Sequence, residues 1–369
     1  MSKEFEIGPI RPPSEAESLL LRITRNCPWN RCRFCTIYRG NKFSTRSVEE
    51  IKADIDQVAL YRDNILSGIP EDLYELPEET MQRYLYIMSW LANGGESVFL
   101  QDANTVVLTY DKLREILVHL REKLPNVKRV TTYGRVDSIN KFSVEQLEGL
   151  KEAGLDRIHS GYESGSDSVL SLLNKGFTKA QEIEAGRKVK ESGIELSVYF
   201  MPGAGGIGLS DENAVETADV VNKVQPDFVR IRTFVAQKGT EVIDDISAGV
   251  RVECTDKGKA LELKKMIGHL DVGGGYLFSD HIINLFQEVN GNMKTNKEKM
   301  LAVFADFEKL GEPDQRRYQI ARRMGIVQSL SQFWRLDNRQ MESVEANLGR
   351  LDAEEAFEAF LIRLLRRYI

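Results

Sequence analysis

Cysteine is scarce in this chain of 369 residues, which contains only four of them. Long apolar runs are also lacking, since every hydrophobic stretch is too short or too broken by charge to span a membrane. Residues 1–17 are polar and contain no hydrophobic segment of signal-peptide length. These features argue against a membrane protein and against a disulfide-rich secreted protein, so we expect a cytoplasmic location and no membrane partner.

An excess of positive charge is missing as well. The chain has 50 Lys and Arg against 56 Asp and Glu, which gives a net charge of −6. This balance argues against bulk attraction to nucleic acids or anionic membranes. A local basic groove stays open as an alternative, formed by Arg230 and Arg232 or by the arginines near the C-terminus. The other interpretation of the C-terminal arginines is a solvated helix face.

Three of the four cysteines, Cys27, Cys32 and Cys35, lie within nine residues. Three thiolates cannot pair evenly as disulfides, and a structural zinc site needs a fourth ligand that no histidine spacing supplies. A [4Fe–4S] cluster held by three thiolates keeps one iron open for another ligand. The spacing therefore predicts such a cluster, with zinc or unmodified buried cysteines as the alternatives. The remaining cysteine, Cys254, is expected to be an ordinary buried residue.

Apolar strands alternate with amphipathic helices from residue 18 to about residue 235, which is typical of a parallel sheet covered by helices. The pattern predicts six strands, at residues 18–25, 97–100, 129–132, 157–160, 195–201 and 228–233. It predicts intervening helices at residues 47–62, 78–92, 111–123, 144–153, 178–192 and 213–224. Beyond about residue 250 the pattern predicts helices only, at residues 257–270, 280–289, 297–309, 316–323 and 353–369.

Six strand–helix units predict an α/β fold, a partial (β/α)6 TIM-like barrel with a C-terminal helical extension. We expect an N-terminal segment over residues 1–17, the barrel over residues 18–250 and the extension over residues 251–369. Reactive residues of such folds lie at the carboxyl ends of the strands. The cysteines, Asp102, Arg135, Glu163 and the glycines after Met201 all occupy such positions.

Four motifs occur in order along this region. They are the cysteine motif with Phe34 before its last cysteine, the segment 99–104 after a strand, Tyr162-Glu163-Ser164-Gly165, and Gly203-Ala204-Gly205-Gly206. In these motifs, over residues 18 to about 235, the chain resembles the radical S-adenosylmethionine (SAM) superfamily, in particular its Elongator-like and coproporphyrinogen-dehydrogenase-like branch. One departure is the spacing C-x4-C-x2-C, where the family usually has three residues between the first two cysteines.

The resemblance implies a [4Fe–4S] cluster and SAM as cofactors, with Cys27, Cys32 and Cys35 as iron ligands. It implies reductive cleavage of SAM to a 5′-deoxyadenosyl radical, which abstracts hydrogen from an unidentified substrate. The electron would come from a low-potential donor, a flavodoxin or ferredoxin. The positions that match the family's SAM-binding segments are Phe34, Tyr38, Gln101, Asp102, Arg135, Glu163, Ser164, Met201 and Gly203.

Residues at the ends of the later strands are candidates for substrate contact. Arg230 and Arg232 lie two apart and so face the same side of a strand. If that side is the barrel interior, two buried guanidiniums indicate an anionic substrate; if it is the outer face, they are structural. Tyr199 and His281 are the other candidate catalytic residues. The pair Asp280-His281 is read either as an acid–base pair or as the start of a helix.

Two other functional classes stay open. An RNA-modifying radical SAM enzyme is one, because the branch includes such enzymes, although the acidic composition makes nucleic acid an unlikely partner. A non-catalytic iron–sulfur electron-transfer protein is the other, although it would normally complete four ligands. The scarcity of further cysteines disfavours auxiliary clusters and a dual-cysteine methyltransferase mechanism, and no Asp-x-His-x-x-Gly cobalamin signature occurs.

Overall fold

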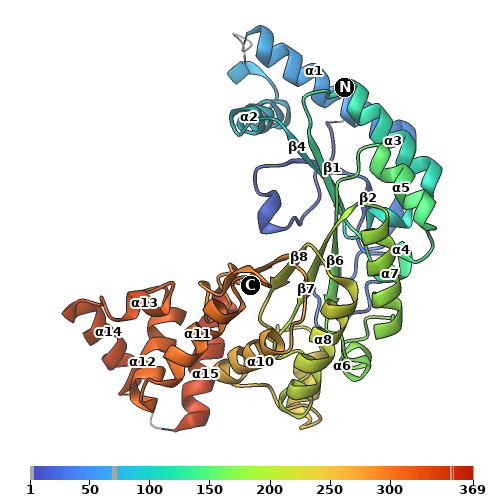
Figure 1. The fold of residues 1–369 in the computed structure, drawn as a ribbon. Coiled ribbons are helices and arrows are strands. Elements are labelled where there is room, and N and C mark those ends of the chain that lie inside the picture. The colour runs from blue at the N-terminus through green and yellow to red at the C-terminus, as the bar shows by residue number, and fades with distance from the viewer. Residues whose placement is uncertain (1–3, 69–72, 350, 352, 369) are drawn as a thin grey trace. The chain divides into compact units, whose positions relative to one another are not determined.

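The computed structural model describes residues 4–68, 73–349, 351 and 353–368. It is an α/β fold in which strands and helices alternate along most of the chain (Figure 1). The strands are β1 (Leu19–Arg22), β2 (Thr24–Arg25), β3 (Ser44–Thr45), β4 (Ser97–Gln101), β5 (Arg129–Tyr133), β6 (Arg157–Glu163), β7 (Glu195–Phe200), β8 (Phe228–Ile231), β9 (Tyr276–Phe278) and β10 (Asn290–Asn292).

Helices follow most of the strands and continue to the end of the chain. They are α1 (Val48–Ser67), α2 (Glu78–Ala92), α3 (Tyr110–Lys123), α4 (Val136–Ile139), α5 (Val144–Glu152), α6 (Asp167–Leu172), α7 (Lys179–Glu191), α8 (Ser210–Val224), α9 (Glu241–Ser247), α10 (Asp256–Gly268), α11 (Lys297–Glu308), α12 (Glu312–Arg323), α13 (Leu330–Phe333), α14 (Asn338–Leu348) and α15 (Glu354–Leu365). Residue 369, the end of the last predicted helix, lies outside the described residues.

The main sheet has eight strands in the order β1-β4-β5-β6-β7-β8-β9-β10, which is also their order along the chain. The pairs β1–β4, β4–β5, β5–β6, β7–β8 and β8–β9 are parallel, and the last pair, β9–β10, is antiparallel. Strands that follow one another in chain order, with helices between them, form the singly wound arrangement of a TIM barrel. Since β1 and β10 end the sheet, the barrel is partial, as predicted.

The C-terminal part differs from the prediction in three respects, the first being two helices, α13 and α14, that were not predicted. Residues 276–278 and 290–292 add two strands to the six predicted ones, and residues 280–289, predicted as a helix, form an irregular connection. Tertiary contacts decide this segment. The side chain of Asn284 donates to the carbonyl of Ile231 at 2.8 Å and accepts the N–H of Thr233 at 2.9 Å, so the connection is tied to the end of β8.

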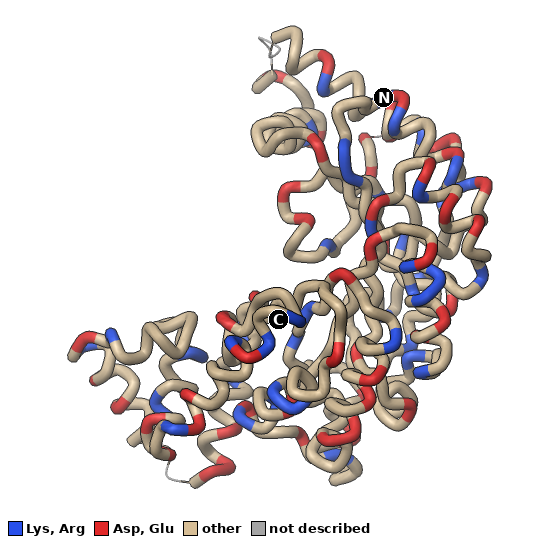
Figure 2. The backbone as a smooth tube through the Cα atoms, viewed as in Figure 1, with Lys and Arg blue, Asp and Glu red and all other residues tan. Residues whose placement is uncertain are grey.

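The chain divides into two compact units. Unit 1 comprises residues 1–30, 38–160 and 184–196, and unit 2 comprises residues 31–37, 161–183 and 197–369. The boundary follows Asn30, within the cysteine loop. Acidic and basic side chains are interspersed along the helices of both units (Figure 2). None of the helices in the described ranges is both long and apolar enough to cross a bilayer.

In unit 1 the strands β1, β4 and β5 are covered by α1, α3 and α5 (Figure 1). Ser47 caps α1 in a reciprocal capping box with Glu50, as its position before the apolar pattern predicts. The inward stripe of α1 includes Ile51, Ile55 and Val58, all essentially buried. Burying such side chains stabilises the unit by about 2 kcal/mol each.

In unit 2 the C-terminal helices pack around an aromatic cluster. The ring of Phe286 lies 5.3 Å from Phe304, 5.2 Å from Phe307 and 5.7 Å from Tyr318, centroid to centroid. A buried ion pair between Arg323 of α12 and Asp256 of α10 ties these helices to the segment after β8. Hence the helical extension is packed on the last strands.

Candidate functional site

The first half of the cysteine loop is organised in unit 1 by Asp102, which follows β4 and is fully buried. Its carboxylate accepts hydrogen bonds from Arg22 at 2.9 Å and from the backbone N–H of Asn26 at 3.1 Å. The hydroxyl of Tyr38 also donates to it. Burial and the neighbouring Asp102 raise the pKa of Tyr38, so this phenol remains a donor. Asp102 thus links Asn26, the residue before Cys27, to Tyr38, which follows the last cysteine of the loop.

Other contacts in unit 1 complete this half of the loop. The backbone N–H of Asn30 points to the Sγ of Cys27 at 3.4 Å, and its side chain donates to the carbonyl of Tyr38 at 2.7 Å. The guanidinium of Arg135 lies 5.3 Å from the ring centroid of Trp29, a cation–π contact. The structure therefore brings Asp102, Tyr38 and Arg135, three of the predicted site residues, to the loop.

Gln101 differs from these residues because its side chain is engaged elsewhere. It is buried and accepts the N–H of Gly8 at 2.7 Å, and its amide donates to the carbonyl of Gly8 at 3.3 Å. This side chain therefore anchors the N-terminal segment on β4. The carbonyl of Gln101 accepts the N–H of Ile23, so its backbone is tied to the segment after β1 as well.

The second half of the loop is held in unit 2. The N–H of Arg33 donates to the carbonyl of Leu173 at 3.0 Å, and the side chain of Asn174 donates to the carbonyl of Arg31 at 2.9 Å. The hydroxyl of Thr36 donates to the side chain of Gln237 at 2.9 Å. Phe34 packs against a buried apolar cluster that includes Val169, Leu173, Met201, Ala204, Phe234, Ala236 and Val242.

The three loop cysteines have the chemistry of iron–sulfur ligands. All four cysteines are described, and none forms a disulfide; Cys27, Cys32 and Cys35 are half-buried, whereas Cys254 is buried. Burial raises the pKa of Cys254 to about 11, which makes it a poor ligand. Across the described ranges, no three His, Cys, Asp or Glu side chains form a preassembled metal site. Three half-buried thiols in one loop are a donor set that fits a [4Fe–4S] cluster.

Glu163 ends β6 with a left-handed backbone, at φ +68°. Such a conformation costs a non-glycine residue about 1 kcal/mol and is common at functional sites. Its carboxylate lies 3.4 Å from the ammonium of Lys175, a buried lysine that lies 5.8 Å from the ring centroid of Phe34. Lys175 was not among the site residues predicted from the sequence. The following Ser164 is buried and accepts the N–H of Ser166 at 3.0 Å.

The glycine loop, residues 203–206, follows β7 and Met201. Gly203 has φ +86°, and a Cβ there would lie 2.7 Å from Cγ of Lys259. Its N–H donates to the carboxyl of Glu262 at 2.9 Å, and Asn213 donates to the same oxygen at 2.6 Å. Glu262 is buried, and this burial raises its pKa from the ordinary 4.5 to about 7. A residue of α10 therefore holds the loop.

This raised pKa makes stability depend on pH. Because folded Glu262 keeps its proton up to about pH 7 while the unfolded chain loses it near pH 4.5, unfolding releases a proton in this window. We expect the contribution of Glu262 to the free energy of unfolding to be fully present below pH 4.5 and to fall by about 3 kcal/mol as the pH rises to 7. Glu358, whose pKa burial also raises to about 7, acts in the same direction.

Urea unfolding between pH 4 and pH 8 measures this dependence in the wild type and in Glu262→Gln. Over this range the stability of the variant should fall less with rising pH than that of the wild type, because the contribution of Glu262 is missing. A variant curve parallel to the wild-type curve would mean that Glu262 is ionised in the folded protein.

Two of the candidate substrate residues, Tyr199 and Arg230, lie in one row across three strands of unit 2. Tyr199 of β7 is the register partner of Arg230 of β8, which is the partner of Phe278 of β9. Arg230 is only 7% exposed; its guanidinium lies 5.2 Å from the ring centroid of Phe278 and 3.9 Å from the carboxylate of Asp280. Phe278 was not predicted, because its strand was not.

Arg232 and His281 depart from their predictions. Arg232 is exposed and lies beyond the end of β8, so only one of the two arginines is buried. His281 does not begin a helix. Burial lowers its pKa to about 4, with a further contribution from Arg232, so its imidazole is neutral at pH 7. Because the imidazole of His281 is neutral, His281 and the exposed Asp280 do not form an ion pair at pH 7.

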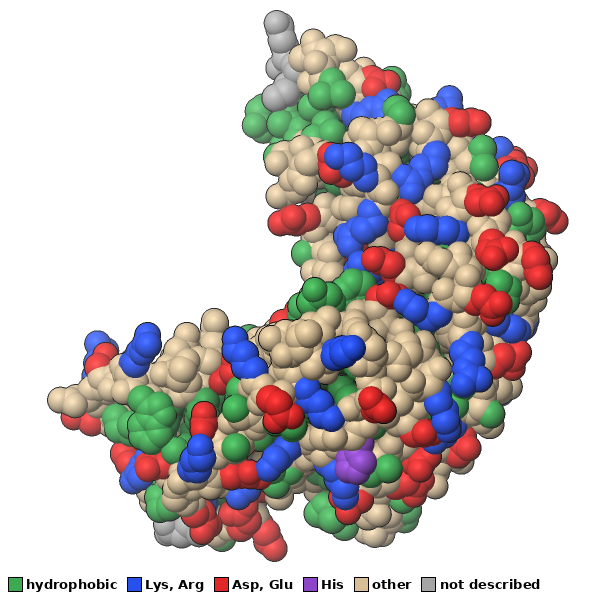
Figure 3. Space-filling view, in the orientation of Figure 1, with side chains coloured by type: hydrophobic (Ala, Val, Ile, Leu, Met, Phe, Trp, Pro, Cys, Tyr) green, Lys and Arg blue, Asp and Glu red, His purple; other side chains and the backbone are tan. Residues whose placement is uncertain are grey.

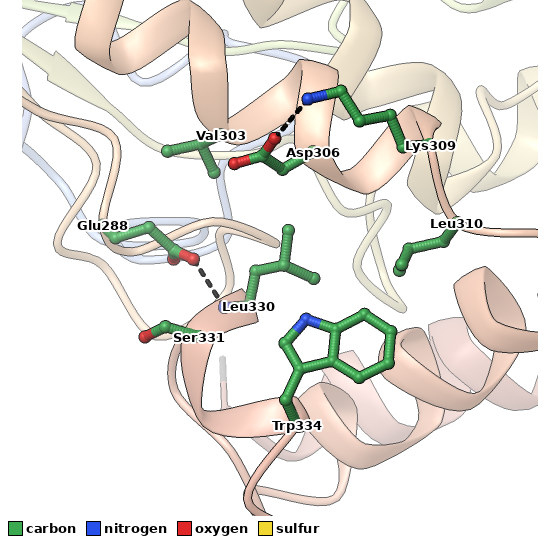
Figure 4. A pocket seen from close by; sticks show the side chains of 8 residues that line it. All are labelled: Glu288, Val303, Asp306, Lys309, Leu310, Leu330, Ser331 and Trp334. Carbon is green, nitrogen blue, oxygen red and sulfur yellow. Dashed lines mark hydrogen bonds and ion pairs between the residues drawn. The ribbon is translucent and has the colours of Figure 1, made fainter.

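A separate pocket of about 620 Å³ lies in the C-terminal helices (Figure 4). Figure 3 shows hydrophobic side chains gathered near α13, where Trp334 is 64% exposed. The carboxyl of Glu288 accepts the N–H of Leu330 at 2.5 Å, and Lys309 pairs with Asp306 at 2.8 Å. None of the predicted site residues lines this pocket.

The fold and the cysteine loop define an α/β protein with a singly wound sheet and three cysteines in the loop after its first strand. The family model of the radical SAM superfamily matches residues 21–220, which is more than half of the chain. The chain therefore belongs to the radical SAM superfamily. It is a radical SAM enzyme, and its cofactors are a [4Fe–4S] cluster and SAM.

Curated relatives match parts of the chain. An uncharacterized methyltransferase of Pyrococcus horikoshii is 24% identical over 228 residues, 60% of this chain and 40% of the relative. A tRNA-2-methylthio-N(6)-dimethylallyladenosine synthase of Syntrophus aciditrophicus is 26% identical over 36% of this chain and 27% of the relative. A 4′-phospho-dehydrooxetanocin synthase of Priestia megaterium is 28% identical over 50% of this chain and 23% of the relative. The chain thus spans two fifths or less of these relatives.

Solved structures resemble the fold more distantly. The radical SAM methyltransferase TsrM from Kitasatospora setae, with cobalamin and a [4Fe–4S] cluster bound, has a TM-score of 0.45 at 14% identity, over 93% of this chain and 61% of that chain. Coproporphyrinogen III oxidase from Escherichia coli has a TM-score of 0.40 at 15% identity, over 64% of this chain and 48% of that chain. Both TM-scores are low, so the family assignment rests on the family model.

Proposed function

We propose that Cys27, Cys32 and Cys35 hold the cluster and that the enzyme uses SAM cleavage to abstract hydrogen from a small anionic substrate. When bound, the reduced cluster and SAM together supply a 5′-deoxyadenosyl radical. The observation that carries the proposal is the three-cysteine loop, whose two halves are each fixed by buried side chains and backbone hydrogen bonds.

The surrounding residues position and shield this chemistry. Asp102, with Arg22 and Tyr38, orders the part of the loop around Cys27. Phe34 packs against the buried apolar cluster and so anchors the part that carries Cys32 and Cys35. We assign SAM contacts to Glu163, Ser164 and the backbone of the glycine loop, which follow β6 and β7. Residues 18–250 would carry the catalysis, in the cytoplasm, with residues 251–369 supporting it.

The substrate class follows from Arg230. A guanidinium that is 7% exposed is held over Phe278, and Asp280 lies 3.9 Å away, beyond hydrogen-bonding distance. Such a guanidinium is suited to bidentate pairing with a carboxylate or phosphate. Tyr199, its register partner, would lie beside the same substrate group, while the exposed Arg232 would contribute long-range attraction only.

The proposal is tested by anaerobic reconstitution with iron and sulfide. The reconstituted protein should contain about four irons per chain, as one cubane requires. After reduction it should convert SAM to 5′-deoxyadenosine. Flavodoxin and ferredoxin are then compared as electron donors in place of a chemical reductant. A protein that binds no iron, or whose cluster leaves SAM intact, would refute the proposal.

Glu163→Gln tests the SAM contact. The substitution keeps the size of the side chain but removes the charge, so it should weaken SAM binding by roughly tenfold while the iron content stays at the wild-type value. Isothermal titration of the oxidised, reconstituted protein with SAM measures this without turnover. Glu216→Gln, which alters an exposed acid in the same unit, is the matched control. Unchanged affinity would remove Glu163 from the SAM site.

An RNA substrate is the second candidate. It is favoured by the likeness to a tRNA-2-methylthio-N(6)-dimethylallyladenosine synthase, whereas the net charge of −6 opposes it. Binding of tRNA across a series of salt concentrations distinguishes the two candidates. A steep loss of affinity with salt would indicate phosphate contacts and favour RNA. Absence of binding at low salt would leave the small anionic substrate.

A further inference from the structure

The segment after β8 makes contacts with two parts of the proposed site in unit 2. It comprises α9 and the turn to Val252. Asp245 on α9 accepts a hydrogen bond from the guanidinium of Arg33 at 2.7 Å, and Arg33 lies between Cys32 and Phe34. The carboxylate of Asp245 is only 13% exposed, so removal of Arg33 would leave a largely buried charge without this partner. One end of the segment thus holds the loop that carries Cys32 and Cys35.

The other end of the segment holds the glycine loop. Arg251 is buried, and its guanidinium donates to the carbonyls of Gly203, at 3.2 Å, and Ala204. The guanidinium also lies 4.5 Å from the ring centroid of Phe234. The N–H of Ile207 donates to the carbonyl of Val252 at 2.9 Å, so the backbone is paired there as well.

A turn joins these two contacts rigidly. The carbonyl of Asp245 accepts the N–H of Val250 at 2.9 Å and that of Arg251 at 3.3 Å, which closes the end of α9. Val242 of α9 belongs to the same buried cluster as Met201 and Ala204, and Phe34 and Ile246 pack against that cluster. Polar and apolar contacts therefore connect the same three segments.

We propose that residues 241–252 act as a clamp that sets the cysteine loop against the glycine loop, with Asp245 and Arg251 as positioning residues. Asp245 holds the Cys32–Cys35 half of the loop in the conformation that the cluster needs. Arg251 holds the backbone of residues 203 and 204 in the conformation that SAM needs. The inference rests on the proposed function, because it assumes that Cys32 and Cys35 hold the cluster.

Iron content tests the first contact. Asp245→Asn and Arg33→Asp each remove the ion pair, and we expect about a tenfold or greater loss in affinity for the cluster, measured as less iron per chain after reconstitution. The charge swap Arg33→Asp with Asp245→Arg should restore iron toward the wild-type value. Glu308→Gln, which breaks an exposed pair with Lys264 elsewhere in unit 2, is the matched control and should keep its iron.

SAM affinity tests the second contact. Arg251→Met keeps a side chain of similar length but removes the donors to both carbonyls, so SAM should bind roughly tenfold more weakly to the oxidised, reconstituted protein. Its iron content should match the wild type.

The outcomes separate the clamp from the proposed function. If the wild type binds the cluster and all variants match it in iron and in SAM affinity, the clamp is refuted and the proposed function stands. If Asp245→Asn and Arg33→Asp lose iron and the charge swap does not restore it, the iron loss does not come from the pair between Arg33 and Asp245, and the clamp is refuted at this contact. If the wild type binds no cluster, the proposed function fails, and the clamp fails with it.

Discussion

Cys32→Ala is expected to abolish formation of 5′-deoxyadenosine from SAM. Cys32 contributes one of three thiolates, and two thiolates cannot hold a cubane with a single open iron. The variant should therefore lose iron as well as activity, even though its fold is retained. Iron per chain, the absorption of the cluster in the visible range and the 5′-deoxyadenosine produced after reduction measure the effect together.

Cys254→Ala is the matched control for this experiment. Cys254 is buried outside the loop, and its pKa is raised to about 11, so the same substitution there removes a small apolar side chain only. It should cost about 1 kcal/mol of stability and leave iron and activity unchanged. If Cys32→Ala still cleaves SAM, or if Cys254→Ala loses the cluster, the assignment of the iron ligands is wrong.

Asp102→Ala is expected to have the largest effect on stability. The substitution leaves the guanidinium of Arg22 and the hydroxyl of Tyr38 without their buried acceptor, and it releases the N–H of Asn26. Because the Asp102 side chain is fully buried, loss of this partner should lower the free energy of unfolding by about 3 kcal/mol. Urea unfolding of the cluster-free protein measures the difference directly.

Asp56→Ala provides the comparison for Asp102→Ala. The Asp56 side chain is 48% exposed and pairs with His119 at 2.9 Å, so its loss should cost less than about 1 kcal/mol. The variant at position 102 should also bind less iron at equal protein concentration, because the residue before Cys27 is no longer fixed. Equal stability of the two variants would mean that Asp102 does not organise the loop.

Local patterns predicted much of the fold. The helices α1, α2 and α3 begin and end within a few residues of their predicted ends, except that α1 continues to Ser67. Their boundaries depend on nearby signals, such as the capping box at Ser47 and the stop at Gly94 and Gly95, both at positive φ. The alternation of strands and helices then indicated a parallel sheet, since each unit repeats the same short-range pattern.

Long-range contacts explain what the patterns missed. Strands β9 and β10 are three residues each, too short to show a period, and they form because β8 offers a free edge. The predicted helix at residues 280–289 is irregular because Asn284 bonds to the backbone of β8. Apolar spacing alone does not distinguish such a buried connection from a helix.

The sequence by itself identified the cysteine loop as the candidate cluster site, because the number and spacing of the cysteines depend on chain order alone. Only the tertiary structure decided what holds that loop. Asp245 and Lys175 lie 210 and 140 residues along the chain from Cys35, and each is an ordinary charged residue in its local context; Asp102 was expected at the site from its place after a strand, but its partners were not. Their roles arise from burial and from partners distant in sequence, which no local pattern specifies.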